Sequence, residues 1–101
     1  MTKRRKQWQD YRVTRPSITI IGLQADVCYR GPRHACRNAI LKASPTNIGY
    51  CWIEIGRAAV ENECWPLQPN ETIAMPITRT DQINVLFDVE DDRLFVLFDN
   101  W

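Results

Sequence analysis

The chain has 101 residues, which fits one small domain, and its 45% hydrophobic and 25% charged composition excludes a disordered, collagen-like or coiled-coil protein. The net charge of +1 is unevenly distributed: residues 1–16 carry six basic residues and one acid (+5), while the other 85 residues carry seven basic and eleven acidic residues (−4). No apolar run approaches the ~20 residues of a membrane span. No apolar signal segment follows the basic N-terminus, so assembly in the cytosol is expected.

Residues 1–16 are predicted to form an extended basic arm ahead of the folded domain. Its candidate contact residues are four consecutive cations and two aromatic residues: Lys3, Arg4, Arg5, Lys6, Trp8 and Tyr11. Such an arm suits an acidic protein surface or a phosphate backbone, and a solvated terminus is the open alternative. The rest of the chain is acidic, and no predicted strand carries an interleaved basic and aromatic face. Nucleic acid is therefore the less favoured partner.

From residue 17 onward, β-branched and alternating segments indicate strands. They lie at 17–23, 38–43, 48–55, 72–78, 83–87 and 94–98, with a short strand or loop edge at 26–30. Pro76 lacks a ladder donor, which predicts an edge position for its strand. The last two segments are predicted to form a terminal hairpin around an acidic turn at 90–92. The predicted fold of residues 17–101 is all-β: an antiparallel β-sandwich or small jelly roll.

Cysteine and histidine side chains offer the main candidates for metal or nucleophilic chemistry. None of the spacings between Cys28, Cys36, Cys51 and Cys64 is the close pair of a structural zinc site. Free thiols are expected in a reducing cytosol, although an oxidising compartment would allow three pairings. His34 and Cys36 are not expected to form an activated dyad. Acidic residues 90–92 fit a solvated turn better than a calcium site. We therefore expect no enzyme, cofactor or metal site.

Trp52 is the candidate contact residue of the folded domain. It lies on the face of its predicted strand opposite Cys51, Ile53 and Ile55. If those three residues face the core, Trp52 is either exposed as an anchor for a partner or covered by the same chain. The sequence leaves both alternatives open.

Six stretches of the chain follow one another in a characteristic order: NAILKASPTN at 38–47, YCWIEIG at 50–56, WPLQPNET at 65–72, and the closing segments IAMPI, INVLF and RLFVLF. This order resembles that of small β-rich structural proteins of tailed-bacteriophage particles. In that pattern an Asn-containing turn leads to a V-x-I-G strand, an x-P-L-x-P-x-E loop and short closing strands. The resemblance covers about two thirds of the chain. Asn70 stands where the pattern usually has Gly.

The resemblance implies a virion component assembled in the host cytoplasm. A capsid decoration protein is expected, binding the major capsid protein and forming a homo-oligomer by non-covalent contacts. A tail, connector or fibre protein is the alternative within the same class. From another class, a carbohydrate-binding β-sandwich would use Trp52 or Trp65 as a stacking platform. An enzyme based on Cys36 ranks third.

Overall fold

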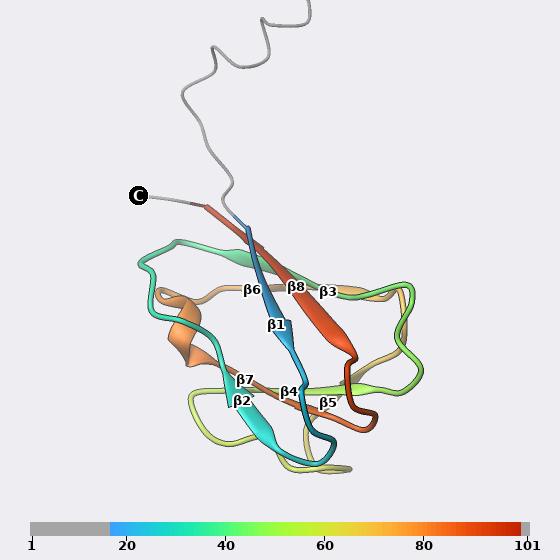
Figure 1. The fold of residues 1–101 in the computed structure, drawn as a ribbon. Helices are drawn as coiled ribbons and strands as arrows, with labels where there is room; N and C mark the ends of the chain where they lie inside the picture. The colour runs from blue at the N-terminus through green and yellow to red at the C-terminus, as the bar shows by residue number, and fades with distance from the viewer. Residues whose placement is uncertain (1–16, 100–101) are drawn as a thin grey trace, which may run out of the picture.

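The computed structural model describes residues 17–99, which confirm the all-β prediction (Figure 1). The strands are β1 (Ser17–Ile21), β2 (Cys28–Arg30), β3 (Ala39–Ala43), β4 (Cys51–Ile55), β5 (Trp65–Leu67), β6 (Thr72–Met75), β7 (Ile83–Phe87) and β8 (Arg93–Phe98), with a 3₁₀-helix, η2 (Thr80–Gln82), before β7. The predicted arm, with its six contact residues, lies outside the described residues. Within 17–99, no helix is long and apolar enough to cross a membrane.

The strands form two antiparallel sheets of four. Sheet A has the order β1-β8-β3-β6, and sheet B has the order β2-β7-β4-β5. The first strand thus pairs with the eighth, the second with the seventh, the third with the sixth and the fourth with the fifth. Only the connection between β4 and β5 joins two strands of the same sheet. Every other connection between described strands crosses from one sheet to the other.

The predicted terminal hairpin is wrong. β7 pairs with β2 and β4 in sheet B, whereas β8 pairs with β1 and β3 in sheet A. The acidic turn between them therefore carries the chain across the core to the other sheet. Both strands alternate in the same way because each turns one face toward that core, so the pattern does not distinguish a hairpin from a crossing.

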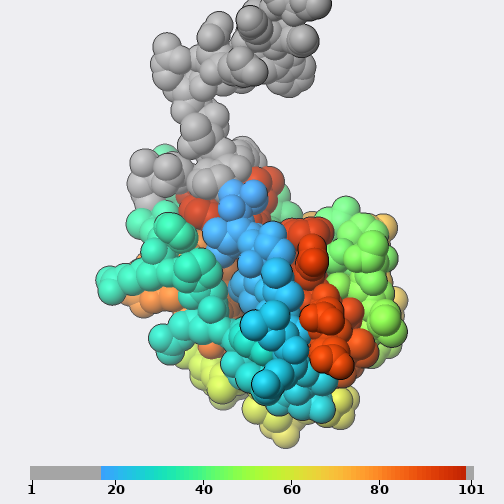
Figure 2. Space-filling view, in the orientation of Figure 1, coloured from blue at the N-terminus to red at the C-terminus, as the bar shows by residue number. Residues whose placement is uncertain are grey.

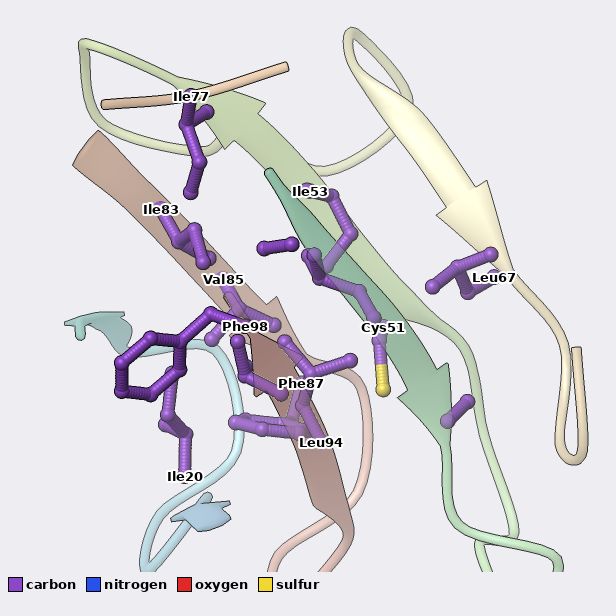
Figure 3. Packing of buried hydrophobic residues seen from close by; sticks show 14 of the residues in the cluster. Ile20, Cys51, Ile53, Leu67, Ile77, Ile83, Val85, Phe87, Leu94 and Phe98 are labelled. Atoms are coloured by element: carbon purple, nitrogen blue, oxygen red, sulfur yellow. The ribbon is translucent and has the colours of Figure 1, made fainter. Parts of the chain in front are cut away.

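Apolar side chains from both sheets meet in one core (Figure 3). The fully buried members include Leu41, Leu94 and Val96 from sheet A and Ile53, Val85 and Phe87 from sheet B. Burying each of these side chains contributes about 1.5–3 kcal/mol before the loss of chain entropy is subtracted. On β4, Cys51 and Ile53 face this core and Ile55 packs at its margin, as predicted. The edge position of β6, directly before Pro76, is also confirmed.

The turn between β7 and β8 carries a buried carboxylate. Asp92 is only 4% exposed. Its side chain accepts the backbone N–H groups of Ile48 (3.0 Å) and Gly49 (2.9 Å). The prediction of a solvated turn holds for Glu90 and Asp91, which are exposed, but is wrong for Asp92. The donated hydrogen bonds compensate for its lost hydration.

Candidate interaction surfaces

Trp52 is the predicted contact residue that falls within the described part of the chain. It lies on the outer face of sheet B, yet it is only 7% exposed. It packs with Ala59 and Leu86, and Cys28 and Cys64 lie against the same cluster. Of the two open alternatives, the structure shows the second: other residues of the same chain cover Trp52. It offers little surface to a partner in this structure.

The cover over Trp52 comes from the segment 56–64, which connects β4 to β5. The segment begins at Gly56, whose φ of 83° favours glycine, and turns again at Asn62 (φ 66°). The backbone N–H of Ala59 donates to Cys28 Sγ at 3.3 Å. Near the end of the segment, Cys64 Sγ donates to the carbonyl of Val60 at 3.2 Å. The thiol of Cys28 on β2 thus attaches this cover to sheet B, and both cysteines are free thiols.

The polar side of Trp52 meets a group of carboxylates. Its indole N–H donates to Asp88 Oδ1 at 2.8 Å. One oxygen each from Asp88, Asp26 and Glu61 lie within 4.8 Å of one another. The charge of Asp88, followed by smaller effects of desolvation, raises the pKa of Glu61. Asp26 and Glu61 are exposed to water, whereas Asp88 accepts the indole N–H.

The remaining cysteines and the histidine make separate contacts. Cys36 is fully buried, and its thiol lies 3.7 Å from the carbonyl of Ile77. His34 is exposed and stacks on Phe98, with ring centroids 5.6 Å apart. Burial, with a smaller contribution from the charge of Asp99, raises the pKa of the Cys36 thiol. The structure therefore places this thiol in the packed core.

Cys51 is the second fully buried thiol. Desolvation, aided by the charges of Asp92 and Asp88, raises its pKa to about 12, against the lowering effect of a hydrogen bond from Asn47. A thiol with so high a pKa stays protonated at neutral pH. Since the thiolate is the nucleophile and the metal ligand, both the burial of Cys51 and its raised pKa disfavour such chemistry at this thiol.

The surface of the described residues offers a small hollow and several exposed apolar side chains. The hollow holds about 140 Å³ and is lined by Glu54, Arg57, Ala58, Val60 and Glu63. Pockets for drug-sized ligands hold roughly 300–1,000 Å³. The second predicted stacking residue, Trp65 on β5, is 57% exposed. The hollow is therefore too small for such a ligand, and Trp65 is a large apolar side chain left exposed on the surface.

No protein-family model, curated protein or solved structure significantly matches the chain. The functional argument therefore rests on this chain's own residues and strand arrangement.

Proposed function

We propose that the chain is a structural protein of a bacteriophage virion, of the capsid decoration type. It binds the major capsid protein and copies of itself by non-covalent contacts. The observation that carries this proposal is the strand pairing, first with eighth, second with seventh, third with sixth and fourth with fifth. That pairing supports an eight-stranded jelly roll, an architecture used by viral capsid domains and also by lectins and cupins.

Charge supports the same proposal independently of the fold. The arm at residues 1–16 carries +5, and the other 85 residues carry −4. Complementary charges steer association and set its orientation. A decoration protein is bound many times on one lattice, so modest contacts at each copy add up through multivalency.

The test compares three proteins for binding to purified particles that lack this chain. One is the wild type, one has Lys3, Arg4, Arg5 and Lys6 changed to Gln, and the control is Arg57→Gln. Arg57 lies 3.5 Å from Glu54 in an exposed ion pair of the domain, so its loss tests charge in general. Exposed ion pairs contribute about 0.2–1 kcal/mol each, so the arm variant is expected to bind roughly tenfold more weakly.

Co-sedimentation at rising ionic strength measures this binding. The wild type and Arg57→Gln should bind alike, and salt should weaken both because it screens exposed charges. If the arm variant bound as tightly as the wild type, the four arm cations would have no role in binding the particles. Failure of the wild type to bind the particles would overturn the virion assignment itself.

A carbohydrate-binding module is the second candidate. The observation in its favour is the exposed indole of Trp65, since a flat aromatic ring can stack on a sugar. The covered Trp52 does not serve this role in the structure. Retention of the wild type on immobilised glycans, lost in Trp65→Ala, would favour this candidate over the first.

A further inference from the structure

Among residues 17–99, β1 is an edge strand, and one of its sides faces no described strand. It pairs with β8 on the other side, and Gly22, the next residue, donates its N–H to the carbonyl of Asp92 in the same direction. Backbone groups alternate in direction along a strand. The even-numbered residues of β1 therefore face β8, and the backbone groups of Ser17, Thr19 and Ile21 face away from the sheet.

Within the described part of the chain, these outward groups have almost no hydrogen-bond partner. Among residues 17–99, the backbone bond they make outside the ladder is from the N–H of Leu23 to the carbonyl of Ile21, at 3.1 Å. The side chains of Ser17, Thr19 and Ile21 are exposed as well. Figure 2 shows β1 and β8 side by side on the surface of sheet A. Such a row of free donors and acceptors is a template for another strand.

The other three edge strands carry features that obstruct pairing. β5 contains Pro66, which has no N–H to donate. β2 has three residues and ends in the charged Arg30. On β6, the carbonyl of Glu71 accepts the N–H of Ala43, so the backbone groups of Thr72 point away from the sheet. By the same alternation, the residue directly after β6 that would next donate outward is Pro76, which has no N–H. Short strands, charges and prolines are the usual protection of sheet edges.

The five residues of β1 carry none of these features. Its sequence, SITII, has five residues, four of them β-branched, and contains neither a charge nor a proline. β-Branched residues favour the extended conformation. An uncharged strand also brings no like charges together when it meets a copy of itself.

We propose that β1 pairs with β1 of a second copy of this chain, antiparallel about a two-fold axis at Thr19. Thr19 then lies opposite Thr19 of the partner subunit, and Ser17 lies opposite Ile21 of the partner subunit. Up to about six backbone hydrogen bonds join the two A sheets into one continuous sheet. The contact is isologous, because the same strand serves on both sides.

Charge favours a second β1 over the arm as the occupant of this edge. β1 offers no carboxylate to the arm's cations. Antiparallel pairing also starts the two arms, each +5, at opposite ends of the joint, where they repel each other least. The pairing specifies which surface mediates the self-association that the proposed function includes. It therefore rests on the self-association part of that proposal.

The test is the mass of the full chain in solution, measured by sedimentation equilibrium. Thr19→Lys places two ammonium groups opposite each other at the axis. Thr72→Lys is the matched control, because it makes the same change at an exposed position on the other edge strand of sheet A. The wild type and Thr72→Lys should both dimerise, and Thr19→Lys should raise the dissociation constant at least tenfold.

Hydrogen exchange locates the contact. The amides of residues 17, 19 and 21 should become protected as the wild-type concentration rises, and should stay unprotected in Thr19→Lys. The pairing would be overturned if the wild type were monomeric or formed assemblies with an odd number of copies, or if the two variants had equal masses in solution. If the wild type is monomeric but binds particles, the pairing is overturned and the capsid assignment stands. If it dimerises as proposed but does not bind particles, only the capsid assignment is overturned.

Discussion

At the scale of single residues, the carboxylate of Asp92 joins two segments that are far apart in the sequence. Both of its oxygens accept the N–H of Ile48, at 3.0 and 3.2 Å, and one also accepts the N–H of Gly49 at 2.9 Å. Beside it, the side chain of Asn47 accepts the N–H of Arg93 at 2.7 Å and donates to its carbonyl at 2.8 Å. The loop before β4 is thereby fastened to the crossing between β7 and β8.

Asp92→Asn tests the weight of this carboxylate. The amide has nearly the same shape, but it removes the charge and points N–H donors toward backbone N–H groups. Leaving buried groups unsatisfied in this way should lower the free energy of unfolding by about 1–3 kcal/mol. Urea denaturation followed by tryptophan fluorescence measures the loss.

Asp91→Asn is the matched control one residue earlier. Asp91 is exposed and has a φ of 69°, a conformation that Asn also tolerates. Its substitution should change the free energy of unfolding by no more than about 0.5 kcal/mol. Equal losses for the two variants would contradict the assigned role of Asp92.

At the scale of elements, the alternation of apolar residues predicted most strands because each strand has one face on the core. Cys51 and Ile53 on β4 illustrate this, as both are buried on the predicted side. The same alternation carries no information about which strand lies alongside. For this reason the alternation predicts a hairpin between β7 and β8, where the chain in fact crosses from one sheet to the other. For the same reason the sequence does not distinguish a sandwich from a jelly roll.

The candidate site was only partly predictable for a related reason. The pattern placed Trp52 on the outer face of its strand, which is where it lies. Its burial depends on segment 56–64, whose polar sequence predicts no regular element and which folds across Trp52 through tertiary contacts. The acidic run at 90–92 likewise gives no sign that Asp92, rather than its neighbours, turns inward.

Two tryptophans of sheet B separate packing from surface contact. Trp52→Ala should lower the free energy of unfolding by about 3–5 kcal/mol, because it opens a cavity under segment 56–64 and leaves Asp88 without the indole donor. Trp65→Ala, at a side chain that is 57% exposed, should cost no more than about 1 kcal/mol. Urea denaturation followed by circular dichroism compares them. A larger loss in Trp65→Ala would contradict the cover over Trp52.

At the scale of the whole molecule, the first and last strands lie side by side. Ser17 is paired with Leu97, so sheet A is complete only when both ends of the described chain are in place. Such distant pairings make folding slow, because the chain loses conformational entropy in closing large loops before the stabilising contacts can form. They also bring the start of β1, where the arm joins, next to the end of β8.

This arrangement of the strands predicts that residues 17–101 fold without the arm. The eight described strands pair with one another and pack into two hydrophobic clusters within residues 17–99. Deleting residues 1–16 should leave one cooperative urea transition, with a free energy of unfolding within about 1 kcal/mol of the wild type. The full-length Gln variant of the four arm cations separates loss of charge from loss of chain length. A drop of several kcal/mol in the deletion alone would show that the arm belongs to the folded domain rather than to its contacts.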